Sequence, residues 1–156
     1  MSTKKNISPT ALIRASGHMR GKVEVDPAGT TLDCYTTEVH RDEADGRLHF
    51  WADMRVMGEA HTSLTISCVL RDKDLSTGSY PVTPVEHSQV VQLIYKEAPS
   101  AIGWEARAGE VTLRNFVNVD HLEGRLVFIT REYSGKHFSM DVEFSIRGFD
   151  AKAGAK

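Results

Sequence analysis

The segment from Phe138 to Gly148 alternates between apolar and polar residues without interruption. Its apolar positions are Phe138, Met140, Val142, Phe144 and Ile146, and every residue between them is polar or charged. Because successive side chains of a β-strand point to opposite faces, this pattern predicts a strand with one face on an apolar core and the other in water. Such strands are typical of antiparallel sheets that are covered on one side only.

Other alternating runs are shorter and are separated by residues that favour turns. Asp26, Pro27 and Gly29 predict a turn, so we expect the two runs beside them to pair as a hairpin. The further strands that we expect cover Gly17–Val25, Thr31–Val39, Arg47–Val56, Thr62–Leu70, Ser79–Val82 and Gln89–Tyr95, together with runs that begin at Gly109 and Gly124.

Two segments lack this alternation. The stretch His40–Gly46 ends in Asp-Gly, a preferred tight-turn pair, and is expected to be a hairpin loop. The stretch Lys96–Ala108 contains Pro99, Gly103 and Trp104, and we expect a long loop or an irregular edge there.

The pattern predicts an all-β fold of about 8–10 strands with little helix, as a single antiparallel β-sandwich or up-and-down β-barrel. It does not distinguish an open sandwich from a closed barrel. With 156 residues the chain is long enough for one self-sufficient core. We expect a single β domain over residues 11–150, with flexible tails at residues 1–10 and 151–156.

Charge and hydropathy exclude several classes of partner. The formal net charge of -2 gives no electrostatic reason to bind nucleic acid, and no apolar run is long enough to span a membrane. Lys4 and Lys5 are not followed by a hydrophobic stretch, so we expect no signal peptide and a cytoplasmic location. Cys34 and Cys68 lack the spacing of a zinc or redox motif, which favours buried free thiols, although a single disulfide is an open alternative.

The second half of the chain carries a recognisable order of motifs. "LSTGSYPV" is followed by a tyrosine-bearing strand, then by "GEVTLRNF", "LEGRLVFIT" and the closing alternating strand. This order, over roughly residues 75–149, resembles a group of small bacterial β-domain proteins of uncharacterised function, many of them lipoproteins. The chain departs from that group at its start, because "MSTKKNIS" is not a lipoprotein signal. The resemblance implies a sandwich or barrel-like fold and supplies no catalytic residues.

No motif for catalysis or for a cofactor is found. The seven histidines do not stand at metal-ligand spacing, and there is no nucleophile elbow, phosphate-binding glycine loop or dinucleotide fingerprint. We therefore predict no catalytic residue, no metal, no cofactor and no enzymatic activity. An enzyme whose site is built from loop histidines and acids is the least favoured alternative.

Two tryptophans are the strongest candidates for function. Trp51 falls on the polar face of its strand with His49 and Arg55, and Trp104 falls in the expected loop. Tryptophan and arginine are common anchors of protein interfaces, so we predict that His49, Trp51, Arg55 and Trp104 bind a partner protein or a second copy, as in a homodimer. Alternatively, the segment around Trp104 covers Trp51. The main hypothesis is thus a non-catalytic interaction or assembly module of a bacterial cell.

A second hypothesis places a small apolar ligand inside a β-barrel, as in a carrier or sensor. The interior would then be lined by Phe50, Met54, Leu64, Phe128, Met140 and Phe144.

Overall fold

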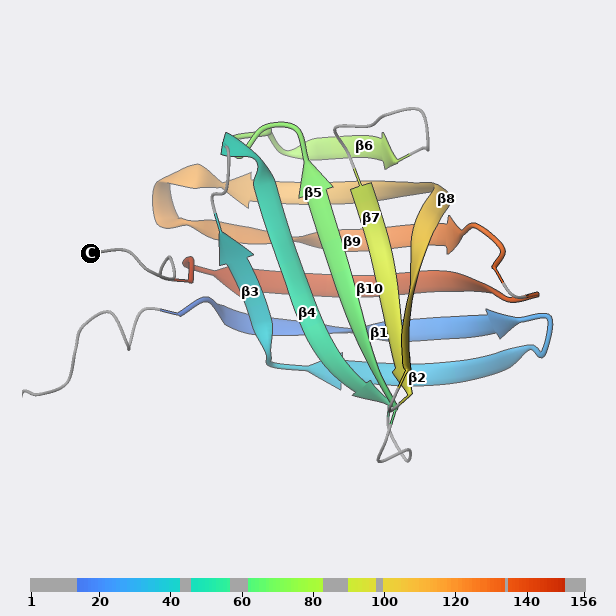
Figure 1. Cartoon of the computed structure of the whole chain (residues 1–156). Coiled ribbons are helices and arrows are strands. Elements are labelled where there is room, and N and C mark those ends of the chain that lie inside the picture. The colour runs from blue at the N-terminus through green and yellow to red at the C-terminus, as the bar shows by residue number, and fades with distance from the viewer. Residues whose placement is uncertain are drawn as a thin grey trace, which may run out of the picture.

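The computed structural model describes residues 14–42, 46–56, 62–82, 90–97, 100–133 and 135–150 (Figure 1). These residues form ten strands and one short 3-10 helix, η3 (Val117–Val119), which confirms the all-β prediction. The strands are β1 (Ser16–Asp26), β2 (Thr30–Thr36), β3 (Val39–Asp42), β4 (Leu48–Val56), β5 (Thr62–Leu70), β6 (Gly78–Val82), β7 (Val90–Glu97), β8 (Ser100–Phe116), β9 (His121–Thr130) and β10 (His137–Arg147). In the described ranges no helix is long and apolar enough to cross a membrane.

Eight of the strands close into an antiparallel β-barrel. The pairing runs β2–β1–β10–β9–β8–β7–β5–β4, and β2 pairs with β4 at Cys34 and Tyr35 to close the ring. In Figure 1 the strands β3, β4, β5 and β7 cross in front of a second layer made of β6, β9, β10, β1 and β2. The fold is therefore a closed barrel and not an open sandwich, because β2 pairs with β1 in one layer and with β4 in the other.

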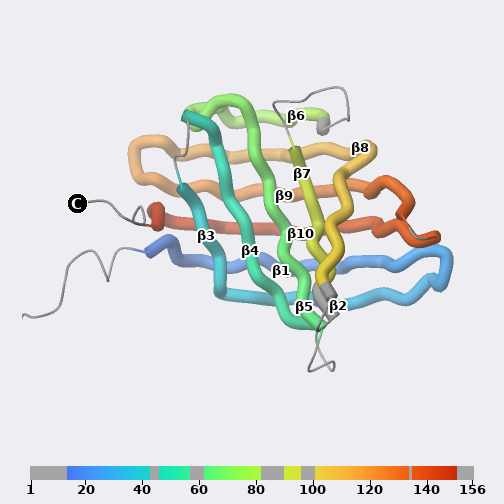
Figure 2. Tube along the Cα trace, viewed as in Figure 1, coloured from blue at the N-terminus to red at the C-terminus, as the bar shows by residue number. Residues whose placement is uncertain are grey.

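β8 joins the two layers along its length. Its first half pairs with β7 and its second half with β6 and β9. Figure 2 shows this strand leaving the front layer and bending into the back layer. The register shifts between Ala106 and Ala108, a β-bulge that re-aims the strand. At Gly109, just after the bulge, a Cβ would lie 2.4 Å from the carbonyl oxygen of Val127, so only glycine fits the bend.

The structure corrects two predictions from the sequence. The expected loop over Lys96–Ala108 is wrong, because Ser100–Ala108 belongs to β8 and Lys96 and Glu97 end β7. The expected loop over His40–Gly46 is wrong in its first part, because Val39–Asp42 forms β3, which pairs with β4. The expected tails at residues 1–10 and 151–156 lie outside the described residues.

The inward rows of the strands form the apolar core of the barrel. Alternation in β4, β5 and β10 is confirmed, since every second side chain in each is buried. The phenyl rings of Phe50 on β4 and Phe144 on β10 have their centroids 4.4 Å apart, so the two layers are in direct contact. Complete burial of such side chains stabilises a fold by roughly 1.5–3 kcal/mol each.

Cys34 and Cys68 are buried free thiols, as expected. Cys34 is paired with Val56 on β4, whereas Cys68 is paired with Phe50 on the same strand. These two partners, Val56 and Phe50, are six positions apart on β4, a length of about 20 Å. A disulfide requires Cα atoms within about 7 Å, so these two thiols do not bridge in this fold.

Candidate functional site

Two imidazole rings stack on the indole of Trp51 on the outer face of the front layer. His40 of β3 lies directly opposite Trp51 in the β3–β4 register, and its ring centroid is 5.0 Å from the indole. His49 is two residues before Trp51 on β4, with its ring centroid 4.7 Å away. We call His40, His49 and Trp51 the indole stack. All three side chains are partly exposed.

Carboxylates hold both histidines. Nδ1 of His40 lies 2.7 Å from Oδ2 of Asp150, and its Nε2 lies 3.6 Å from Oδ2 of Asp53. Nδ1 of His49 lies 3.0 Å from Oδ1 of Asp42. Because a carboxylate only accepts hydrogen bonds, each Nδ1 donates, which fixes the orientation of both rings. These hydrogen bonds hold both imidazole rings against the indole.

Asp150 has a second role at the end of the barrel. Its Oδ1 accepts a hydrogen bond of 2.9 Å from the backbone N–H of Ala15, just before β1. Its own N–H donates to the carbonyl oxygen of Arg41 over 2.8 Å, and the Arg41 guanidinium lies 4.3 Å from the centre of the Phe149 ring. Asp150 thereby ties β3, the start of β1 and the end of β10 together.

The four residues predicted as an interaction surface do not lie together. His49 and Trp51 belong to the indole stack, and Arg55 is exposed on the same face of β4. Trp104 is 4% exposed and points into the core from β8, where its ring packs against Phe138 with centroids 4.8 Å apart. Trp104 therefore neither covers Trp51 nor belongs to an outer surface.

Tyr35 on β2 is an exposed aromatic residue that the sequence analysis did not single out. It is 52% exposed and lies where the two layers join. In register it stands between Arg20 on β1 and Arg55 on β4. The outward position of Tyr35 could have been read from the alternation of Leu32, Cys34 and Thr36, but the closeness of Arg20 and Arg55 depends on barrel closure.

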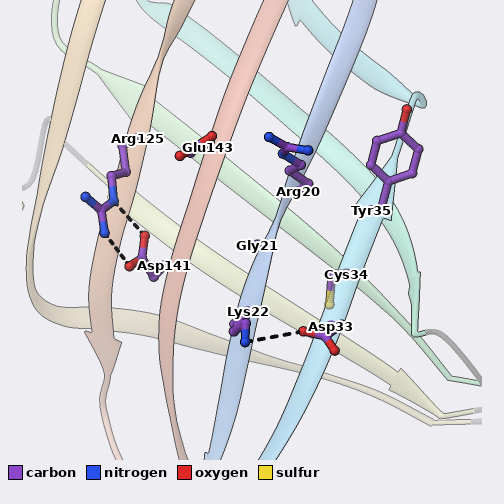
Figure 3. A pocket seen from close by; sticks show the side chains of 9 residues that line it. All are labelled: Arg20, Gly21, Lys22, Asp33, Cys34, Tyr35, Arg125, Asp141 and Glu143. Carbon is purple, nitrogen blue, oxygen red and sulfur yellow. Dashed lines mark hydrogen bonds and ion pairs between the residues drawn. The ribbon is translucent and has the colours of Figure 1, made fainter.

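A shallow depression of about 550 Å³ lies on the outer face of the back layer, over β2, β1, β10 and β9 (Figure 3). On its β9 side, Nε and Nη2 of Arg125 bind the two carboxylate oxygens of Asp141 over 2.7 and 2.5 Å. This hydrogen-bonded pair lowers the pKa of Asp141 and raises that of Arg125. On its β2 side, Lys22 and Asp33 are 4.0 Å apart.

The chemistry available at these surfaces is recognition through rings, cations and hydrogen bonds. No cluster of three or more histidine, cysteine or acidic residues suited to a metal ion occurs in the part of the chain that the structure describes. His61 lies outside that part. Burial raises the pKa of the Cys34 thiol to about 11 and raises that of Cys68 further, so neither thiol is an activated nucleophile.

Comparison with known proteins adds no relative. No protein family, curated protein or solved structure matches this chain. The resemblance of residues 75–149 to small bacterial β-domain proteins stays a prediction.

Proposed function

We propose that this protein is a non-catalytic interaction module that binds a partner protein, or a second copy of itself, through the indole stack. The observation that carries the proposal is the fixed orientation of His40 and His49 around Trp51. A large aromatic side chain that is already ordered loses little conformational entropy on binding, which favours it as an interface anchor. A bacterial cytoplasm as the setting belongs to the same proposal.

The competing explanation is that the indole stack has only a structural role. Substitution of Trp51 distinguishes this structural role from partner binding. In Trp51→Ala the barrel should fold, because the indole lies outside the core, while binding of the partner weakens by at least about tenfold. Phe116→Ala is the matched control, since Phe116 is 45% exposed and lies away from β4 on β8. The two variants and the unchanged protein would be compared as baits in quantitative affinity capture and by sedimentation velocity.

Three results are informative. Loss of one specific partner, or of self-association, in Trp51→Ala but not in Phe116→Ala supports the proposal. Equal capture and equal sedimentation in all three proteins contradict it. Loss in both variants also contradicts it, because it shows that any exposed aromatic has the same effect.

The apolar-carrier hypothesis has less support from the geometry. The six side chains that would line an interior site are at most 3% exposed, and the rings of two of them, Phe50 and Phe144, are in contact across the interior with their planes 33° apart. The enzyme hypothesis has imidazole–carboxylate pairs at His40 and His49, but both histidines lie on strands, β3 and β4, rather than on loops.

A further inference from the structure

Five outward side chains form one lateral row across the barrel wall. In register, Arg125 on β9 is paired with Glu143 on β10, Glu143 with Arg20 on β1, Arg20 with Tyr35 on β2, and Tyr35 with Arg55 on β4. Neighbouring strands are about 4.8 Å apart, so these side chains are direct neighbours. The row brings together residues from position 20 to position 143, and it exists only because the barrel closes between β2 and β4.

The charges in this row are unevenly matched. Arg125 is neutralised by its bidentate ion pair with Asp141. The negative charge of Glu143 also raises the pKa of Arg125. Arg20 and Arg55 are exposed and form no ion pair with any residue within the described ranges. With Arg125 bound to Asp141, the row keeps the positive charges of Arg20 and Arg55 against one acid, Glu143, which stands beside Arg20 in register.

The exposed residue Tyr35 stands between Arg20 and Arg55 in the strand register. His18 lies on the same side, with its ring centroid 6.5 Å from that of Tyr35 and the planes 22° apart. The Cα atoms of Arg20 and Arg55 are about 10 Å apart, twice the strand spacing, so their long side chains can reach one group placed above Tyr35. Figure 3 shows Arg20 between Glu143 and Tyr35, and all three residues line the depression.

We infer that Arg20, Tyr35 and Arg55 form a binding site for the anionic group of a ligand that also carries an aromatic or apolar body. Guanidinium groups bind carboxylate and phosphate oxygens through paired charge-assisted hydrogen bonds, and a phenol ring adds an apolar face and a hydroxyl donor. Arg20 and Tyr35 themselves line the depression of about 550 Å³, which has the size of a small-molecule site. The body of the ligand lies in this depression, where most of the other lining residues are charged. The anion is a phosphate or a carboxylate, and Glu143 disfavours ligands with further negative charge over β10.

The test is a titration of the ¹⁵N-labelled protein at low salt with phenyl phosphate and, separately, with benzoate, followed by ¹H–¹⁵N correlation spectra. We expect saturable shifts of the amides of residues 20, 35 and 55 with at least one probe. Removing one charge-assisted partner weakens binding by about tenfold, so Arg20→Gln and Arg55→Gln should each show that loss. Glu143→Gln should tighten binding severalfold because it removes a negative charge from the row.

Arg114→Gln is the matched control. Arg114 is an exposed arginine on β8 that already pairs with Glu123 over 2.7 Å, and its loss should leave the affinity unchanged. Saturation by phenyl phosphate alone identifies a phosphate site, and saturation by benzoate alone identifies a carboxylate site. Absence of saturable shifts with both probes overturns the inference, as does an affinity in Arg20→Gln and Arg55→Gln equal to that of the control.

This site goes beyond the proposed function and can fail separately from it. Trp51→Ala should bind both probes as the unchanged protein does. Arg20→Gln should keep whatever partner the indole stack binds.

Discussion

Nδ1 of His40 lies 2.7 Å from Oδ2 of Asp150, a contact between residues 110 positions apart that joins β3 to the segment after β10. The same carboxylate accepts the N–H of Ala15. The Asp150 side chain thus orients the His40 ring and also joins the segment after β10 to the residue just before β1.

This double role predicts a measurable loss of stability. Asp150→Ala removes two hydrogen bonds, one to the imidazole of His40 and one to the backbone N–H of Ala15, and should lower the free energy of unfolding by about 1–3 kcal/mol. Urea denaturation measures this change. Asp33→Ala is the control, because Asp33 is largely exposed and 4.0 Å from Lys22, and its effect should stay within about 0.5 kcal/mol. Equal losses in the two variants would show that Asp150 has no special role.

The contact between Phe50 and Phe144 predicts a filled barrel. Phe50→Ala leaves a void in a packed interior and should destabilise the fold by about 3–5 kcal/mol, measured by chemical denaturation. Phe116→Ala, at an exposed position, should change stability by less than about 1 kcal/mol. A loss below about 1 kcal/mol for Phe50→Ala would instead indicate an open interior, as the apolar-carrier hypothesis requires.

The Arg125–Asp141 pair predicts the direction of one pH effect. The pKa of Asp141 is lowered in the folded protein, so the pair stabilises the fold at pH values above the unfolded pKa of about 3.9. This stabilisation is lost as the pH falls through the folded pKa of Asp141. A carboxyl NMR titration should give a midpoint for Asp141 below its ordinary value. In Arg125→Gln the midpoint should rise toward that ordinary value, and an unchanged midpoint would show that Arg125 is not the cause.

Burial of the two thiols predicts slow chemistry. The raised pKa values of Cys34 and Cys68 leave almost no thiolate near pH 8, and both side chains are at most 3% exposed. Ellman's reagent should therefore label the native protein slowly and the urea-unfolded protein at both positions within minutes. Fast labelling of one thiol in the native protein would show that its strand opens readily.

The alternation of apolar and polar residues predicted most of the strands and which of their side chains face the core. The alternation in β4, β5 and β10 follows from burial of one strand face, so the inward positions of Phe50, Ile66 and Val142 were predicted correctly. The second half of β8 was predicted as the run from Gly109, but its first half was missed because Gly103 faces outward without a side chain and the bulge between Ala106 and Ala108 breaks the period of two. That error also placed Trp104 in a loop instead of in the core.

The candidate sites depend on long-range pairing that no local pattern contains. The outward position of Trp51 was predicted, but His40 was assigned to a loop and Asp150 to no role, so the indole stack was not expected as a unit. Tyr35, Arg20 and Arg55 become neighbours only through the β2–β4 pairing, which a sequence without a known register does not determine.

Photo-crosslinking from position 51 tests the central proposal most directly. A photoreactive phenylalanine derivative would replace Trp51 in one protein and Phe116 in another, and each would be irradiated in the cells that express it. The proposal predicts one discrete adduct from position 51, whose mass distinguishes a second copy of the chain from a different protein, and no such adduct from position 116. Absence of an adduct from position 51, or the same set of adducts from both positions, would contradict it.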